Sequence, residues 1–193
     1  DLPLLTGIPR SVPVVASVSE AMVYGPQVAV VGLAPSGGAL PEGVRQSVLE
    51  ALRNGLSVVS GLHTKLATDL ELQAQVQPGC WIWDLRQEPA GLGVAAARAA
   101  ALPCRRILAV GTDMSVGKMS AALELTAAAR QRGLDARFVG TGQAGILIAG
   151  GGIPLDAVRV DYAAGAVEKA VLQVAEGAGE ESLVFVEGQG SFC

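Results

Sequence analysis

One segment of the chain has the residue types and the spacing of a phosphate-binding loop. It follows an apolar run expected to form a strand, and an Ala-rich run expected to form a helix comes directly after it. In such a loop, backbone N–H groups and the positive end of the helix dipole converge on an anion, and a lysine adds a mobile cation. We therefore expect phosphate contacts from Gly111, Thr112, Asp113, Met114, Ser115, Val116, Gly117, Lys118, Met119 and Ser120.

The loop departs from the usual GxxxxGK[ST] pattern at both ends. Thr112 stands at the first glycine position, and Gly111 comes one residue earlier. Met119 stands where a hydroxyl normally binds Mg²⁺, and Ser120 comes one residue later. Ser120 is therefore the candidate magnesium ligand of the loop. An ordinary Gly-containing turn between a strand and a helix is the alternative interpretation.

A carboxylate, Glu187, ends the apolar run at 183–187. A side chain at the C-terminal end of a buried parallel strand faces the crevice in which α/β proteins bind their ligands. We therefore expect Glu187 to act with Lys118 as a catalytic residue, as a proton acceptor or as a Mg²⁺ ligand beside Ser120. A strand end that faces only solvent is the alternative.

A second glycine-rich segment, GTGQAG at 140–145, has the GxGxxG spacing of a dinucleotide-binding fingerprint, with Asp161 about 20 residues later. The third glycine of that fingerprint must enter a helix. Three consecutive glycines and a proline in the following ILIAGGGIPLD disfavour a helix, so we expect a substrate loop instead, with a plain turn as the alternative. The expected substrate contacts are Thr141, Gly142, Gln143, Asp161, Gln189 and the chain's single histidine, His63.

The elements that must position these residues alternate between short apolar runs and longer helical patterns. Apolar runs without polar alternation predict strands covered on both faces, and hence parallel sheets. The expected strands are 12–16, 27–33, 56–60, 81–85, 106–110, 136–139, 157–160 and 183–187. The expected helices are 41–54, 65–76, 94–101, 115–132 and 163–175.

This order of elements predicts the α/β fold class and two domains. We expect a Rossmann-like N-terminal domain at 1–86, a linker with a short helix at 87–103, and a P-loop NTPase-like parallel-sheet domain at 104–193. The abrupt start and the end soon after an apolar strand lead us to expect a chain truncated at both ends. A strand at 183–187 with an exposed edge would invite pairing, so we also expect a homo-oligomer.

Composition excludes several classes of partner. The net charge is −4, from 14 basic and 18 acidic side chains, which argues against nucleic acid. No apolar stretch approaches the roughly 18 residues of a membrane span. The three cysteines form no CxxC pair, which favours a reducing compartment, here the cytoplasm, over a disulfide scaffold or a zinc site.

The motifs also resemble known families. The loop GTDMSVGK is similar to the GTDxxVGK loop of dethiobiotin synthetase, and VEGQG is similar to that enzyme's VEGAG. Over nearly the whole chain, the sequence more closely resembles the D-glutamate N-acetyltransferase-like family, in which a hydroxyl one residue beyond the usual position is common. The matching motifs are GLH at 61–63, WDLR at 83–86, GTDMSVGK at 111–118, TGQAGILIAGGG at 141–152, VDYAAGAVE at 160–168 and VEGQGS at 186–191.

This resemblance implies transfer of an acetyl group from acetyl-CoA to the amine of an amino acid such as D-glutamate. The loop would then hold phosphates of coenzyme A, and Glu187 would accept the proton of the amine. Two alternatives remain: an ATP-dependent ligase or kinase of the dethiobiotin synthetase type, which would need ATP and Mg²⁺, and a non-catalytic nucleotide-binding fragment. Met119, beside the loop lysine, counts against the ATP-dependent alternative.

Overall fold

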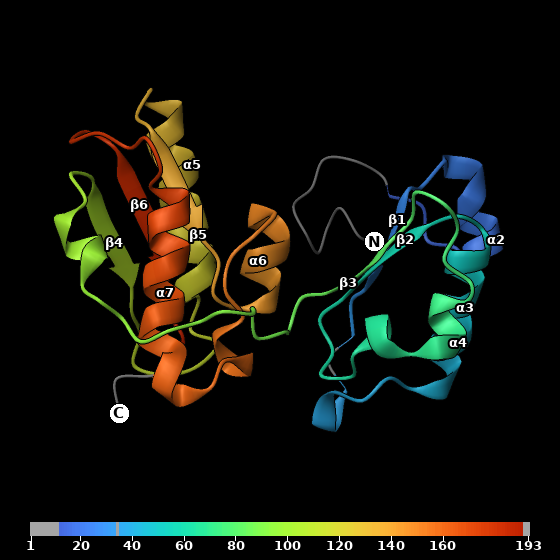
Figure 1. Cartoon of the computed structure of the whole chain (residues 1–193). Helices are drawn as coiled ribbons and strands as arrows, with labels where there is room; N and C mark the ends of the chain where they lie inside the picture. The colour runs from blue at the N-terminus through green and yellow to red at the C-terminus, as the bar shows by residue number, and fades with distance from the viewer. Residues whose placement is uncertain (1–11, 34, 191–193) are drawn as a thin grey trace. The chain divides into compact units, whose positions relative to one another are not determined.

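The structure, a computed structural model, describes residues 12–33 and 35–190. The chain divides into two compact units, Asp1–Asp84 and Leu85–Cys193. Within its described residues, each unit holds a three-stranded sheet in which every strand pair is parallel (Figure 1). The predicted α/β class with two parallel sheets is therefore confirmed. None of the helices in the described ranges is long and apolar enough to cross a bilayer.

The first unit is built on a sheet with the order β1-β2-β3. Its central strand, β2, is buried along its whole length, and the apolar face of one long helix packs on the sheet. The strands are β1 (Val28–Val31), β2 (Ser57–Ser60) and β3 (Ile82–Asp84). The helices are α2 (Val18–Ala21), α3 (Glu42–Arg53) and α4 (Leu70–Gln73), with 3₁₀ turns η1 (Met22–Tyr24), η2 (Ser36–Gly38) and η3 (Leu66–Thr68).

Two predictions for the first unit are wrong. Residues 12–15 form no strand: Pro13 lacks an N–H donor and Val14 is 79 % exposed, so the valines pair with neither sheet. The helix expected at 65–76 is divided into η3 and α4 at Asp69. The Asp69 carboxylate accepts hydrogen bonds from two backbone N–H groups of α4 and thereby starts a new helix there.

The second unit has the strand order β4-β6-β5, which places the phosphate-loop strand beside the strand that carries Glu187. The strands are β4 (Arg105–Ala109), β5 (Ala136–Val139) and β6 (Leu183–Glu187). The helices are α5 (Lys118–Gln131), α6 (Gln143–Ala149) and α7 (Val160–Val174), with 3₁₀ turns η4 (Arg98–Ala101) and η5 (Leu155–Ala157).

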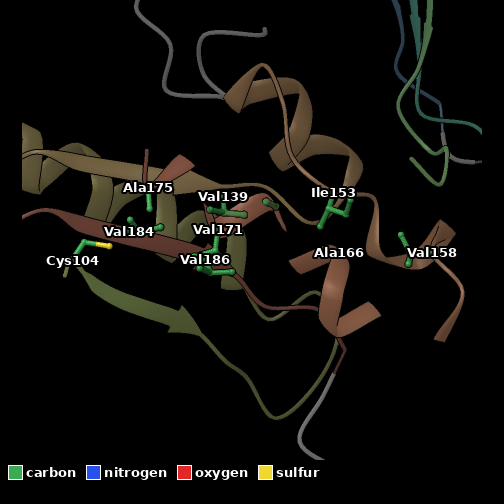
Figure 2. Close-up of a cluster of buried hydrophobic side chains, with 10 residues drawn as sticks. Cys104, Val139, Ile153, Val158, Ala166, Val171, Ala175, Val184 and Val186 are labelled. Carbon is green, nitrogen blue, oxygen red and sulfur yellow. The ribbon is translucent and has the colours of Figure 1, made fainter. Parts of the chain in front are cut away.

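The central strand β6 is covered on both faces. Val184 and Val186 pack with Val171 of α7, as Figure 2 shows, whereas Phe185 packs against α5 on the opposite face. The expected exposed edge at 183–187 is therefore wrong, because β6 pairs with β4 on one side and β5 on the other. Burial on both faces explains why its sequence, LVFVE, lacks polar alternation.

Local backbone geometry corrects three further boundaries. No strand forms at 157–160: Val158 is buried in the core, but Val160 begins α7 and is 89 % exposed. The helix expected from residue 115 starts only at Lys118, because Ser115 and Gly117 have positive φ angles of 58° and 98°. In the segment 94–101, Ala97 has a φ of 56°, which leaves only the 3₁₀ turn η4.

A buried carboxylate fixes the chain that leads into this second sheet. Glu168 of α7 accepts hydrogen bonds from the backbone N–H groups of Ala96 at 2.8 Å and Ala99 at 3.2 Å, next to η4. The N–H donor of Ala96, above all, holds the pKa of Glu168 below its usual range. The Glu168 carboxylate thus holds residues 96–101 against α7.

This arrangement predicts a pH-dependent contribution of Glu168 to stability. A carboxyl group whose pKa is lowered by folding stabilises the protein above its unfolded pKa of about 4.3, and this stability is lost as the pH falls through the lower, folded pKa. Glu168→Gln should therefore lower the urea midpoint at pH 7, and the difference from wild type should shrink below about pH 4. Glu180→Gln, at an exposed position, should leave the midpoint at pH 7 unchanged. An equal loss at every pH would contradict the role of the charge.

Candidate functional site

The segment Gly111–Lys118 joins the C-terminal end of β4 to the first residue of α5. Gly117 caps the helix in a left-handed conformation and has no side chain to cap the first turn of α5. The first backbone N–H groups of a helix have no acceptor within the helix, so this turn presents donors and a partial positive charge to an anion. The strand, loop and helix context predicted for these residues is therefore present.

The first glycine of the loop has a steric role although it stands one residue early. A Cβ atom on Gly111 would lie 2.7 Å from Cγ2 of Val116 and 3.3 Å from Cγ of Lys118. Both distances are shorter than ordinary van der Waals contact. The aliphatic part of the Lys118 side chain and Val116 therefore pack directly against Gly111. A glycine one residue before the usual position thus still allows the loop to form a tight turn.

Lys118 lies between the loop and the segment that follows β6. Its Nζ atom donates to the backbone carbonyl oxygens of Asp113 and Gly190, each at 2.6 Å, and the side chain is half-buried. Gly188 makes the close approach of the two segments possible, because a side chain there would collide with the carbonyl oxygen of Ala109. The lysine ammonium is held by neutral carbonyls, and a phosphate can replace them as its acceptor.

Glu187 is 6 % exposed, and its carboxylate lies at the N-terminus of α6. Its Oε2 atom accepts hydrogen bonds from the backbone N–H groups of Thr141 at 2.8 Å and Gly142 at 3.1 Å. The hydroxyl of Thr141 donates to the Glu187 carbonyl oxygen at 2.8 Å, and Nε2 of Gln189 donates to that hydroxyl at 3.1 Å. Within the described residues, no hydrogen bond to Oε1 is recorded, so Oε1 is the oxygen available for chemistry.

The glycines of GTGQAG make room for this carboxylate. A Cβ atom on Gly145 would collide with Oε2 of Glu187, and one on Gly142 would lie 3.2 Å from Oε1. A Cβ atom on Gly140 would collide with the backbone of Gly145. The glycine spacing is therefore explained by close packing around Glu187.

The expectation that no helix follows GTGQAG is wrong. α6 spans Gln143–Ala149, and Gly150, the first of the three consecutive glycines, caps its C-terminus in a left-handed conformation. The N–H groups at its start, which in a dinucleotide fingerprint would face a pyrophosphate, are occupied by the Glu187 carboxylate. The expected absence of a helix is therefore no argument against a dinucleotide site. Such a site is disfavoured because the Glu187 carboxylate already occupies the N–H groups of Thr141 and Gly142.

Two adjoining cavities share Lys118 and Glu187. One, of about 420 Å³, is lined by the phosphate loop and the start of α5. The other, of about 300 Å³, is lined mainly by branched aliphatic side chains. The shared residues are Lys118, Glu187, Gly188, Gln189 and Gly190. The first cavity adds Met114, Ser115, Gly117, Met119 and Ser120. The second adds Leu108, Val110, Gly111, Thr141, Leu155, Val167 and Val186.

The structure brings together many, but not all, of the residues predicted from the sequence. Thr141, Gly142 and Gln189 surround Glu187. Gln143 opens α6, and its buried Oε1 atom has no hydrogen-bond partner among the described residues. Asp161 lies exposed in the first turn of α7 and lines neither cavity.

His63 belongs to the first unit, where its ring packs against Gly38 and its backbone N–H donates to the Gly38 carbonyl oxygen. In the second unit, sequence reasoning missed the aliphatic wall formed by residues such as Leu155 and Val167. These two residues carry no local signal of a binding site, since apolar side chains are equally typical of a core.

The predicted magnesium ligands, Ser120 and Glu187, line the same cavity. A hydroxyl and a carboxylate are oxygen donors of the kind that Mg²⁺ uses together with water and phosphate oxygens. Among the described residues, no group of three or more His, Cys, Asp or Glu side chains forms a metal site. These two residues would therefore hold a magnesium ion only together with ligand oxygens and water.

Two family models match the sequence of this chain. The P-loop domain of DUF1611, described as a domain of unknown function, matches residues 93–193, and its Rossmann-like N-terminal domain matches residues 1–88. The chain belongs to the DUF1611 family. A DUF1611 family protein from Anabaena variabilis has a crystal structure that is similar, with 51 % sequence identity and a TM-score of 0.90 over 99 % of this chain and 55 % of that one.

Two curated relatives of this DUF1611 chain are named D-glutamate N-acetyltransferase. The one from Pseudoalteromonas sp. is 38 % identical over 176 residues, and the one from Tritonibacter scottomollicae is 37 % identical over 180 residues. Each alignment spans 91 % of this chain and 51 % of the relative, so the chain spans about half the length of the curated relatives it matches. The family predicted from the motifs is confirmed.

The packing around Glu187 predicts that Gly145 is sterically required. In Gly145→Ala, the added methyl group would displace the Glu187 carboxylate from its two N–H donors, and we expect a loss of about 1–3 kcal/mol in the free energy of unfolding by urea. Gly151→Ala is the matched control, because a Cβ atom there would meet nothing within 4 Å. It should change stability by less than about 0.5 kcal/mol. A fully stable Gly145→Ala variant would contradict the observed position of the carboxylate.

Proposed function

We propose that the protein carrying this chain is an N-acetyltransferase that moves an acetyl group from acetyl-CoA to the amine of an amino acid, with D-glutamate as the leading candidate. The observation that carries this proposal is the adjacency of Lys118, on an anion-binding loop, to Glu187, with both lining the same two cavities. The names of the curated relatives supply the reaction. The free thiols of Cys80 and Cys104 support a cytoplasmic location.

The loop side of the site is suited to the phosphates of coenzyme A. The N–H groups at the start of α5 and the Lys118 ammonium supply fixed and mobile donors for an anion. On binding, Lys118 would exchange its bonds to the Asp113 and Gly190 carbonyl oxygens for stronger, charge-assisted bonds to phosphate. Loop and lysine thus hold the donor and leave the thioester free to react.

The transfer step requires a proton acceptor. The amine nitrogen attacks the thioester carbonyl, the new C–N bond forms as the C–S bond breaks, and the sulfur leaves as a thiolate. The proton lost by the amine passes to a base, and we assign this role to Oε1 of Glu187. Its other oxygen, Oε2, is held by the N–H groups of Thr141 and Gly142, so the acceptor atom has a fixed position.

The assignment predicts that Lys118 serves ligand binding more than folding. Lys118→Ala should change the free energy of unfolding by less than about 0.5 kcal/mol, because the side chain is half-buried and its two acceptors are neutral carbonyls. It should raise the Kd of acetyl-CoA about 10- to 150-fold, through loss of a charge-assisted phosphate contact. Calorimetric titration of acetyl-CoA and of ATP–Mg²⁺ checks this.

The exposed lysine of the first unit, Lys65, supplies the control: Lys65→Ala should leave both affinities unchanged. If Lys118→Ala weakens ATP–Mg²⁺ alone, and turnover releases ADP, a ligase or kinase replaces the transferase. If wild type binds neither compound, the loop is a structural turn and the proposal is wrong.

A separate prediction concerns Glu187. The carbonyl oxygen of a glutamine can still accept from the N–H groups of Thr141 and Gly142, so Glu187→Gln keeps the loop in place but removes the base. We expect the Kd of acetyl-CoA to stay within about twofold of wild type and kcat to fall about 10²-fold or more. A kcat near that of wild type would show that Glu187 only positions the α6 loop.

A further inference from the structure

The aliphatic cavity beside the phosphate loop is lined in part by apolar side chains that are exposed to solvent. Leu108 and Val110 are 57 % and 53 % exposed, although they lie next to a charged lysine and a strand end. Val167 of α7 and Val186 of β6 extend the same wall. Apolar side chains left in water at the edge of an anion site gain free energy when a ligand covers them.

The composition of this cavity restricts the ligand class. Among the described residues that line it, Lys118 is the sole cation and none is aromatic. A dicarboxylate would lack the arginines that bind carboxylates in pairs, and a purine base would lack a ring on which to stack. A flexible, uncharged chain fits better. At about 300 Å³, the cavity is at the small end of ligand pockets, which suits one arm of a ligand more than a whole cofactor.

The two cavities adjoin, and this indicates which part of a ligand the aliphatic cavity can hold. They share Lys118, Glu187 and the segment 188–190, so one ligand can place phosphates at the loop and a neutral chain along the aliphatic wall. Gln189 lines both cavities, so its amide group can serve the amide groups of such a chain.

We propose, on the basis of the proposed function, that the cavity lined by Leu108, Val110, Leu155, Val167 and Val186 holds the pantetheine arm of acetyl-CoA, with the acetyl thioester next to Glu187. The same cavity rejects the dicarboxylate acceptor, whose charged groups bind outside these two cavities. The site is therefore divided into a phosphate subsite at the loop and an arm subsite between β4, β6 and α7.

The test compares two ligands, one with the pantetheine arm and one without it. Acetyl-CoA carries it, whereas adenosine 3′,5′-bisphosphate carries phosphates without it. Val167→Phe fills the aliphatic cavity and should raise the Kd of acetyl-CoA about 10-fold or more, while the Kd of adenosine 3′,5′-bisphosphate changes less than about twofold. Val160→Phe is the matched control on the same helix, because Val160 is exposed and lines neither cavity. It should affect neither ligand.

A second variant keeps the test decisive if Val167→Phe does not fold. Leu108→Trp enlarges a side chain that is already exposed, so the fold should tolerate it, and it should show the same selective loss of acetyl-CoA affinity. Equal weakening of both ligands, or no effect of either variant, would overturn the arm subsite while leaving the proposed function intact. If wild type binds ATP–Mg²⁺ but not acetyl-CoA, the proposed function fails, and the arm subsite fails with it.

Discussion

The second unit depends on one carboxylate, that of Glu187, held by the backbone N–H groups of Thr141 and Gly142. A buried carboxylate is costly unless donors surround it, and a helix N-terminus supplies both donors and a favourable dipole. The bond ties the end of β6 to the start of α6. The adjacent pairing of β6 with β4 then fixes the distance between this carboxylate and the phosphate loop.

Close packing around the ends of β5 and β6 explains several glycines of the second unit. The glycines at 140, 142 and 145 are required because side chains there would collide with Glu187, Gln189 or the nearby backbone. Gly188 is required because the chain passes against the carbonyl oxygen of Ala109 as it leaves β6. A spacing that resembles a dinucleotide fingerprint therefore has a different cause here: an internal anion occupies the N–H groups that a pyrophosphate would need.

Lys118 connects the phosphate loop to the segment that follows Glu187. The Lys118 ammonium bridges the carbonyl oxygens of Asp113 and Gly190, which joins the loop to the segment after β6. Ligand phosphates would compete for that ammonium, so binding at the loop and the position of residues 188–190 are physically linked. The same residues border the aliphatic wall, which places the proposed base beside the proposed thioester.

The sequence by itself determined what depends on local pattern. Short apolar runs predicted β1–β6, and the strand–glycine–lysine–helix order predicted the phosphate loop, since both follow from burial and backbone geometry. Tertiary structure decided what depends on partners distant in the chain. The valines at 12–15 form no strand because they pair with neither sheet, and Glu187 lies in a central strand instead of at an open edge. The Glu187 carboxylate, 44 residues after Gln143, binds the two backbone N–H groups that directly precede α6, an interaction with no local signature in the sequence.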